Sequence, residues 1–322
     1  MKLKGRIYRG SSGNYWVRVP GDAAEHVVRL KGTLKKELIY TQGDSRPRRV
    51  VSAHKRRATD PVTVGDIVLF DSRQKIIESV EPRRSELARK APSSNEQHVL
   101  VANLDTLFCV LAAAHPDPDL SILDRFVVVA ENQEIAVEIV VNKVDLAGLE
   151  ASRELLRPYE RIGYPIHYTS AKTGAGVDTL RDRLQGRVSA FAGNSGVGKS
   201  SLLNAIQPGL TLKTGDIGES SRQGRHTTTQ AELIPIIDGD SWLADTPGLR
   251  NLDFWEIDEG EVEYGFIEIH DRAHLCQFNN CTHRNEPGCA IQSAIDAGDV
   301  DPRRWRSYVE LYEQAVAEPT QW

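Results

Sequence analysis

The sequence contains a glycine-rich segment whose pattern is typical of the turn between the end of a strand and the start of a helix. Residues 193–200 read G-N-S-G-V-G-K-S, after the apolar run 188–192 and before the helix-forming run 201–206. Glycines there let backbone N–H groups turn inward on phosphate oxygens, and the helix N-terminus adds positive potential. The segment therefore predicts a phosphate-binding loop on a strand–loop–helix unit.

Four further short motifs accompany this loop, and their order is unusual. Residues 142–145 (N-K-V-D) and 170–172 (S-A-K) precede it, whereas 225–229 (R-H-T-T-T) and 245–248 (D-T-P-G) follow it. A guanine-nucleotide switch uses these five motifs, and its phosphate loop normally comes first. Apolar strands alternate with amphipathic helices from about residue 99 onward, so we expect a central α/β P-loop GTPase domain with a circularly permuted motif order.

The N-K-V-D and S-A-K motifs predict which base is bound. The Asp145 carboxylate can accept from both N1–H and the 2-amino group of guanine, whereas adenine leaves it unpaired. Lys143 can lie along the base, Asn142 can brace the loops, and the Ala171 N–H can meet O6. The expected nucleotide contacts are Asn142, Lys143, Val144, Asp145, Ser170, Ala171, Lys172, Gly193, Asn194, Ser195, Gly196, Val197, Gly198, Lys199, Ser200 and Ser201.

The remaining polar residues of the motifs predict a site for Mg²⁺ bound together with GTP. Lys199 is expected to neutralise β- and γ-phosphate oxygens, Ser200 to ligate the metal, and Asp245 to hold it through water. One threonine of the segment 227–229 should add a hydroxyl in the GTP state. We favour Thr228, and its two neighbours stay open as alternatives.

Hydrolysis is expected to be slow unaided, because Leu249 stands where many switches place a glutamine that orients the attacking water. His226 is a candidate replacement, and an exposed loop histidine without a catalytic role is an equal alternative. The Gly248 N–H could contact the γ-phosphate. The expected catalytic residues are therefore His226, Lys199, Thr228 and Gly248.

The N-terminal part is strongly basic and reads as short strands. Residues 1–90 contain 21 Lys+Arg against 10 Asp+Glu, a net charge of +11, while the remainder contains 19 against 35, so that the chain carries −5. Strand-like runs punctuated by Gly, Ser, Pro and Asp predict a small β-barrel. Its aromatic residues, Tyr8, Tyr15, Trp16 and Phe70, fit an oligonucleotide-binding (OB) fold, although strand aromatics more often belong to the core.

A polar loop at residues 41–60 adds Arg46, Arg48, Arg49, Lys55, Arg56 and Arg57. The charge of this end favours contact with a polyanion over a merely solvated surface. A stretch rich in Pro, Ser and charge follows at about residues 82–97 and is expected to be a linker.

Cysteine usage predicts a metal site. Cys276, Cys281 and Cys289 surround His283, which provides three thiolates and one imidazole, a complete tetrahedral set for one structural Zn²⁺. Three buried thiols without metal are the alternative, and the acidic, loop-rich segment offers little core for them. Cys109, alone in an apolar run, is expected to be a packed strand residue.

We therefore expect four parts: an OB-fold RNA-binding domain at 1–85, a linker at 86–98, the permuted GTPase domain at 99–253, and a mainly helical zinc-binding domain at 254–322. The last part should end in a capped amphipathic helix after Asp301. The N-terminus lacks the apolar core of a signal peptide, so we expect a cytoplasmic protein without membrane contact, and a monomer.

This constellation resembles the RsgA (YjeQ) family of circularly permuted bacterial GTPases over nearly the whole chain. The resemblance implies an OB-fold N-terminal domain, GTP hydrolysis stimulated by the small ribosomal subunit and its rRNA, and a late-stage role in maturation of that subunit, with other assembly factors as further candidate partners. It also implies a hydrophobic residue at position 249 and a histidine at 226 that is discussed as catalytic. The long basic loop 41–60 departs from the family's barrel connection, so its RNA contact is a hypothesis from charge alone.

Two other functions fit the same sequence. One is an RNA-binding scaffold that retains a barely hydrolysed guanine nucleotide, and turnover with and without small subunits separates it from an enzyme. The other is a permuted GTPase acting on the large subunit, against which the barrel and the cysteine module argue. The acidic run at residues 256–263 would repel RNA phosphates, so we expect it to face solvent or a basic protein.

Overall fold

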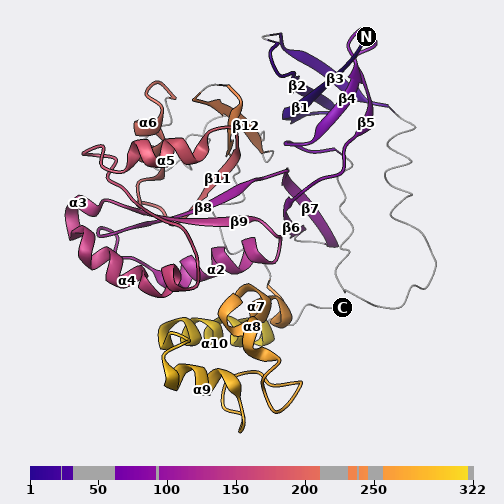
Figure 1. Ribbon diagram of the computed structural model, residues 1–322. Helices are drawn as coiled ribbons and strands as arrows, with labels where there is room; N and C mark the ends of the chain where they lie inside the picture. The colour runs from indigo at the N-terminus through magenta and orange to yellow at the C-terminus, as the bar shows by residue number, and fades with distance from the viewer. Residues whose placement is uncertain are drawn as a thin grey trace, which may run out of the picture. The chain divides into compact units, whose positions relative to one another are not determined.

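The computed structural model describes residues 1–22, 24–31, 62–91, 94–210, 231–237, 239–245 and 257–317 (Figure 1). The basic loop 41–60 and the motif 225–229 lie outside the described residues. The chain divides into two compact units. One comprises Met1–Thr106, Leu184–Ala190 and Ser221–Phe254, and the other comprises Leu107–Arg183, Phe191–Ser220 and Trp255–Trp322.

The N-terminal strands close into a small barrel, as the sequence predicts. The order of the strands is β1-β2-β3-β5-β4, and pairing of β1 with β4 completes the ring. This is a five-stranded barrel of the OB type. Alternate strand residues, together with Val62 from the segment before β4, fill its interior: Ile7, Val17, Val28, Val68, Phe70 and Ile77. The strands are β1 (Lys2–Ser11), β2 (Asn14–Arg18), β3 (His26–Leu30), β4 (Ile67–Asp71) and β5 (Ile76–Val80).

The stretch expected as a linker instead forms a hairpin of β6 (Glu86–Ala91) and β7 (Ser94–Ala102). Its strands pair antiparallel, and the register sets Leu87 opposite Val101. Both side chains are fully buried. The polar composition of this stretch masked a few apolar residues at alternating positions, and burial of those residues makes the segment a hairpin.

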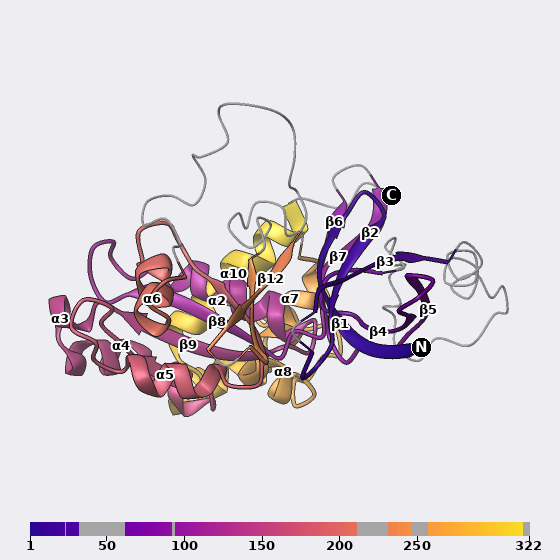
Figure 2. The ribbon, with the colours of Figure 1, turned by 90° about the horizontal axis from the view of Figure 1, so that it is seen from above.

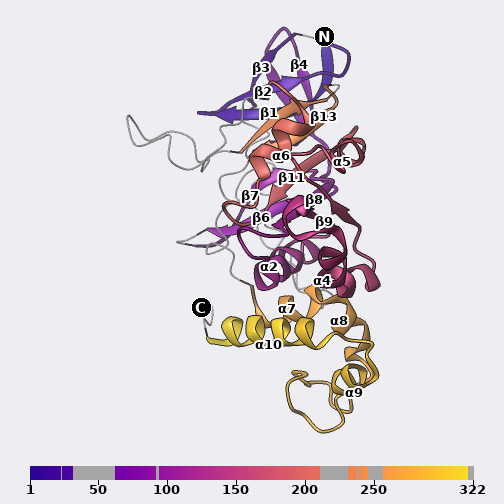
Figure 3. The same ribbon diagram turned by 90° about the vertical axis from the view of Figure 1, so that its left-hand side faces the viewer.

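A second hairpin belongs to the same unit as the barrel. It consists of β12 (Glu232–Ile236) and β13 (Ser241–Asp245), which pair antiparallel along their whole length. Residues 188–190 of β11 (Val188–Ala192) pair parallel with β13 (Figure 3). Strand β12 is bonded on its other side to β1. The strand that delivers the phosphate loop and the strand that ends at Asp245 are therefore neighbours, as in a P-loop sheet.

In the other unit, strands β8 and β9 are neighbours (Figure 2), and β10 lies on the other side of β9 in the same sheet. The register of β9 with β10 is parallel. Each strand after β8 is reached through a helix, which is the βαβ order predicted from sequence. These elements are β8 (Thr106–Ala112), α2 (Leu120–Glu131), β9 (Ala136–Asn142), α3 (Val144–Ala147), α4 (Leu149–Arg161), β10 (Ile166–Tyr168), α5 (Val177–Leu184) and α6 (Lys199–Ile206).

The C-terminal part is helical, as expected. Asp301 caps its last helix by accepting from the Arg303 N–H at 2.8 Å. Asp258 and Glu261 form a capping box at the start of its first helix, so part of the acidic run at residues 256–263 serves to cap that helix. The helices are α7 (Glu259–Gly265), α8 (Ile267–Ala273), α9 (Ala290–Ala297) and α10 (Pro302–Ala317).

Helix α2 is the support on which these C-terminal helices pack. A Cβ on Gly265 would lie 2.6 Å from the Val128 Cα, so only glycine permits this approach of α7 to α2. The Asn132 side chain adds a bond by donating to the Glu261 carbonyl at 2.7 Å. The GTPase core and the helical region are thus in direct backbone contact within this unit.

A buried ionic cluster secures the same junction. Arg304 of α10 is 2% exposed and donates to both carboxylate oxygens of Glu268, at 2.8 and 3.0 Å, and to Asp124 of α2. Tyr159 of α4 also donates to Asp124, at 2.6 Å, and the Arg304 guanidinium lies between the rings of Tyr159 and Phe266. Removal of one partner from such a cluster leaves uncompensated buried charge, so the cluster specifies one docking geometry.

Glu138 provides a pH-dependent test of the core of this unit. Burial of Glu138 opposes its charge, but bonds from His167 (2.6 Å) and Arg183 (3.2 Å) prevail and lower its pKa to about 2 from 4.5. A lowered carboxyl pKa stabilises the fold at pH values above the unfolded-state pKa, and this contribution is lost as the pH falls through the folded-state pKa.

We expect Glu138→Gln to remove about 2 kcal/mol of unfolding free energy at neutral pH, with allowance for solvent screening. The deficit should shrink between pH 4.5 and pH 2. Urea unfolding at stepped pH measures it, and Glu154→Gln, on the exposed face of α4, is the control. A deficit that stays constant across this range would contradict the assignment.

Candidate guanine-nucleotide site and metal cluster

The phosphate loop adopts the turn that its glycines predict. Gly193 has φ 145°, and a Cβ there would lie 2.1 Å from the Val110 carbonyl oxygen. Gly198 has φ 92° and caps α6 directly before Lys199. The Lys199 ammonium folds over the loop and donates to the carbonyls of Gly193 (2.7 Å) and Asn194 (2.8 Å). The backbone of the loop therefore curves around the Lys199 ammonium.

Asn142 joins the phosphate loop to the base-reading motifs. Its Nδ2 donates to the Val197 carbonyl at 3.0 Å, and its Oδ1 accepts from the Ala171 N–H at 3.2 Å. A Cβ at position 198 would lie 2.5 Å from Nδ2, so this approach requires glycine there. One buried amide thus connects three motifs that lie up to 55 residues apart in sequence.

The Asp145 carboxylate and the Lys143 ammonium are both held in place. Ser170 Oγ donates to Asp145 Oδ1 at 2.6 Å, which leaves the other carboxylate oxygen for a base edge. Lys143, which has φ 63°, donates to the Gly196 carbonyl at 2.7 Å and to the His115 carbonyl. This arrangement can present an acceptor to two adjacent N–H donors, which is the pattern of guanine.

The structure brings together most of the predicted nucleotide residues. Ser200 and Ser201 lie in the first turn of α6, and Val144 opens α3 beside Asp145. Asp245 is the last residue of β13 and belongs to the unit that contains the barrel. His226, Thr227, Thr228, Thr229, Gly248 and Leu249 lie outside the described residues, so their roles stay predictions.

Ser170 is expected from the sequence as a nucleotide contact, and in the structure its side chain donates to Asp145. One partner in this site has no signal in the sequence. The His115 carbonyl accepts from Lys143, and no sequence motif indicates a backbone acceptor.

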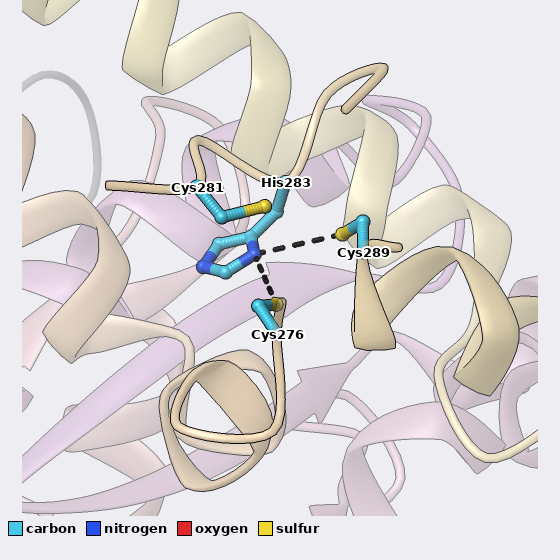
Figure 4. A group of neighbouring side chains, drawn as sticks. All are labelled: Cys276, Cys281, His283 and Cys289. Carbon is cyan, nitrogen blue, oxygen red and sulfur yellow. Dashed lines mark hydrogen bonds between the residues drawn. The ribbon is translucent and has the colours of Figure 1, made fainter. Parts of the chain in front are cut away.

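The four predicted metal ligands converge at the junction of α8, the following loop and α9 (Figure 4). The ligand atoms of Cys276, Cys281, His283 and Cys289 all lie within 4.8 Å of one another. Nδ1 of His283 is 3.5 Å from the Cys276 sulfur and 3.7 Å from the Cys289 sulfur. Because sulfurs bound to a tetrahedral ion at about 2.3 Å are separated by just under 4 Å, this donor set fits such an ion.

Groups around the cluster orient its ligands. Glu263 of α7 lies 3.3 Å from His283 Nε2, and this contact lowers the pKa of the Glu263 carboxyl. Such a carboxylate–histidine pair fixes the ring so that Nδ1 faces a metal. Glu286 organises the loop by accepting from Thr282 and Arg284. Burial opposes its charge, but the bonds from Thr282 and from the backbone at Glu286 and Asn285 prevail and lower its pKa to about 2.

Cys109 differs from these three cysteines, as predicted. It lies in β8 and is 1% exposed, and burial raises the pKa of its thiol. Its surroundings are apolar strand neighbours, so it is a core residue. Among the described residues no helix has both the length and the apolar character needed to cross a membrane.

Comparison with known proteins agrees with this geometry. Residues 80–255 match the model of the family described as RsgA GTPase. The chain is 46% identical to the small ribosomal subunit biogenesis GTPase RsgA of Gemmatimonas aurantiaca over 241 residues, 74% of this chain and 78% of that protein. It is 39% identical to the protein of the same name from Moorella thermoacetica over 316 residues, 98% of both chains.

Two solved structures share the fold. The crystal structure of YjeQ from Thermotoga maritima matches with a TM-score of 0.76 and 30% identity, and covers 99% of this chain and 100% of that one. The crystal structure of YloQ, described as a circularly permuted GTPase, matches with a TM-score of 0.70 and 27% identity, over 100% and 98% of the two chains. The similarity thus extends over the barrel, the permuted core and the helical region.

Substitution of Asp145 tests the base-reading geometry. We expect Asp145→Asn to weaken GDP binding about 100-fold, because it replaces a charged acceptor of two hydrogen bonds. Affinity for xanthosine diphosphate should rise, since an amide can donate to the xanthine 2-oxo group. Competition against fluorescent GDP measures both, with Asp178→Asn on the exposed face of α5 as the control. Unchanged preference for guanine would contradict the assignment.

Proposed function

The chain belongs to the RsgA family of circularly permuted GTPases, and on that premise we propose that it hydrolyses GTP as a late-stage maturation factor of the small ribosomal subunit. The bracing of the phosphate loop by Asn142 against the base-reading motifs is the observation that carries the nucleotide part of this proposal. The ribosomal part is supported by the names of the relatives and by the basic barrel.

Residue roles in hydrolysis follow from the motifs. Lys199 neutralises β- and γ-phosphate oxygens, while Ser200 at the start of α6 and Asp245 at the end of β13 are in the chain positions to hold Mg²⁺. When bound, the metal supplies charge neutralisation between the β- and γ-phosphates. Thr228 adds a hydroxyl and Gly248 an N–H to this side of the site, and His226 orients the attacking water.

The ion of the cysteine cluster is Zn²⁺, in our proposal, and its role is structural. Three thiolates and one imidazole are the ligands that zinc prefers, and a full set of four leaves no position open for water. The cluster lies at the core of the helical region, where His283 and Cys289 are nearly fully buried. Zinc binding would therefore contribute to the folding of this region.

The barrel is the proposed rRNA-binding surface. The Arg9 guanidinium lies 4.9 Å above the Trp16 ring, and both side chains are at least partly exposed on β1 and β2. A paired cation and aromatic ring suits phosphate contact next to base stacking. Phe70 by contrast belongs to the barrel core. With no membrane contact proposed, we place the protein in the cytoplasm as a monomer that acts on the subunit.

Turnover with purified ribosomal subunits tests the proposed function. We expect small subunits to raise kcat for GTP by about tenfold or more, because the slow intrinsic site lacks a water-orienting glutamine. Ser200→Ala should lose this turnover and retain GDP binding. Equal turnover with and without small subunits would favour the RNA-binding scaffold. Stimulation by large subunits alone would favour a GTPase that acts on the large subunit.

Zinc content tests the metal assignment. We expect Cys281→Ser to lose its zinc on dialysis against a chelator and to unfold at a lower temperature, because a structural site contributes to folding. Cys109→Ser is the matched control: the same chemical change in the core of β8 should leave zinc content unchanged. Elemental analysis measures the metal, and full retention of zinc by Cys281→Ser would contradict the site.

A further inference from the structure

The barrel is joined by strand pairing to the hairpin that ends at Asp245. Arg9 of β1 pairs with Glu232 of β12, and Glu232 in turn pairs with Asp245 of β13. Both pairings are antiparallel, so the three residues form one row across the sheet. Residues directly opposite one another in antiparallel strands point to the same face, and their Cβ atoms lie about 5 Å apart.

This row places two carboxylates side by side. Like charges directly opposite one another destabilise a sheet unless a cation offsets them. Asp245 is the residue that we propose above as a magnesium ligand, and Arg9 is the cation on the other side of Glu232. Trp16 of β2 is the residue opposite Arg9, and the Arg9 guanidinium lies over the Trp16 ring.

The opposite face of the sheet makes this connection firm. Tyr8 stacks on Trp242 of β13, with ring centroids 6.1 Å apart and planes inclined by 24°. Trp242 is 5% exposed, and the Tyr8 hydroxyl donates to Glu25. Strand β1 is therefore held to the β12–β13 hairpin by backbone pairing and by this ring contact.

We propose that Glu232 and Arg9 are positioning residues for GTP hydrolysis, which set the magnesium affinity of Asp245 by charge and connect it to the polyanion-binding face of the barrel. The proposal rests on the role of Asp245 proposed above. Glu232 strengthens magnesium binding, because its negative charge lies beside the metal-holding carboxylate. Arg9 weakens it from the next position in the row.

A polyanion that contacts Arg9 would neutralise this opposing charge. Docking of RNA phosphates on the barrel would then strengthen magnesium binding at the nucleotide site, and linkage requires that magnesium strengthens RNA binding by the same factor. The row of three charges thus gives the barrel a direct electrostatic effect on Asp245, over a distance of two strand spacings, about 10 Å.

Magnesium titration of nucleotide release tests the proposal without relying on turnover. The dissociation rate of a fluorescent, slowly hydrolysed GTP analogue from the full-length protein is measured against Mg²⁺ at low ionic strength, where screening is weak. We expect Glu232→Gln to raise the half-maximal Mg²⁺ concentration about fivefold and Arg9→Gln to lower it about twofold. Controls are Glu78→Gln and Arg18→Gln, which change the same charges elsewhere in the barrel.

Opposite shifts of the two variants support an electrostatic role. Shifts in the same direction, as loosened strand pairing would produce, or no shift in either, overturn the proposal. Asp245→Asn tests separately whether Asp245 holds magnesium at all. If that variant retains the wild-type Mg²⁺ dependence, the metal role of Asp245 itself is wrong.

Discussion

The nucleotide site depends on the side chain of Asn142. Its amide bonds the phosphate loop through the Val197 carbonyl and the S-A-K motif through the Ala171 N–H. These bonds join residues that are far apart in the sequence, so they do not depend on whether the phosphate loop comes first or last in the chain. A circular permutation changes the connections between strands and leaves such contacts intact, which is why the motifs remain readable in their rotated order.

Helix α2 connects this site to the metal-binding region. Residues 115–119 lead directly into α2, and the His115 carbonyl accepts from Lys143. One turn into the helix, Asp124 accepts from the buried Arg304. The Arg304 cluster, the contact of Gly265 with Val128 and the bond from Asn132 all fall on the same helix. The base-reading motif thus contacts the segment that leads into α2, and the cysteine-rich helical region packs on α2 itself.

The barrel is connected to the GTPase core in a different way, through strands. Its β1 closes the barrel with β4 and also pairs with β12 in the same sheet. The hairpin that it reaches lies in sequence between the threonine-rich motif and the D-T-P-G motif. The two flanking regions thus contact different parts of the GTPase core: the zinc region docks on α2, and the barrel pairs with the strand next to Asp245.

Glycines, a lysine, carboxylates and thiolates at short spacings are sufficient to predict the chemistry of the site, and hydrophobic periodicity is sufficient to predict the barrel and the βαβ order. Contacts between residues far apart in the chain specify what a local pattern does not encode. Residues 82–97 were read as a linker because their composition is polar, yet burial of Leu87 against Val101 makes a hairpin. Likewise, the sequence gives no sign that three charged residues differ from ordinary surface charges: Arg304, Glu263 and Glu232. Their partners depend on helix packing and strand register, which are set by contacts between residues far apart in the chain.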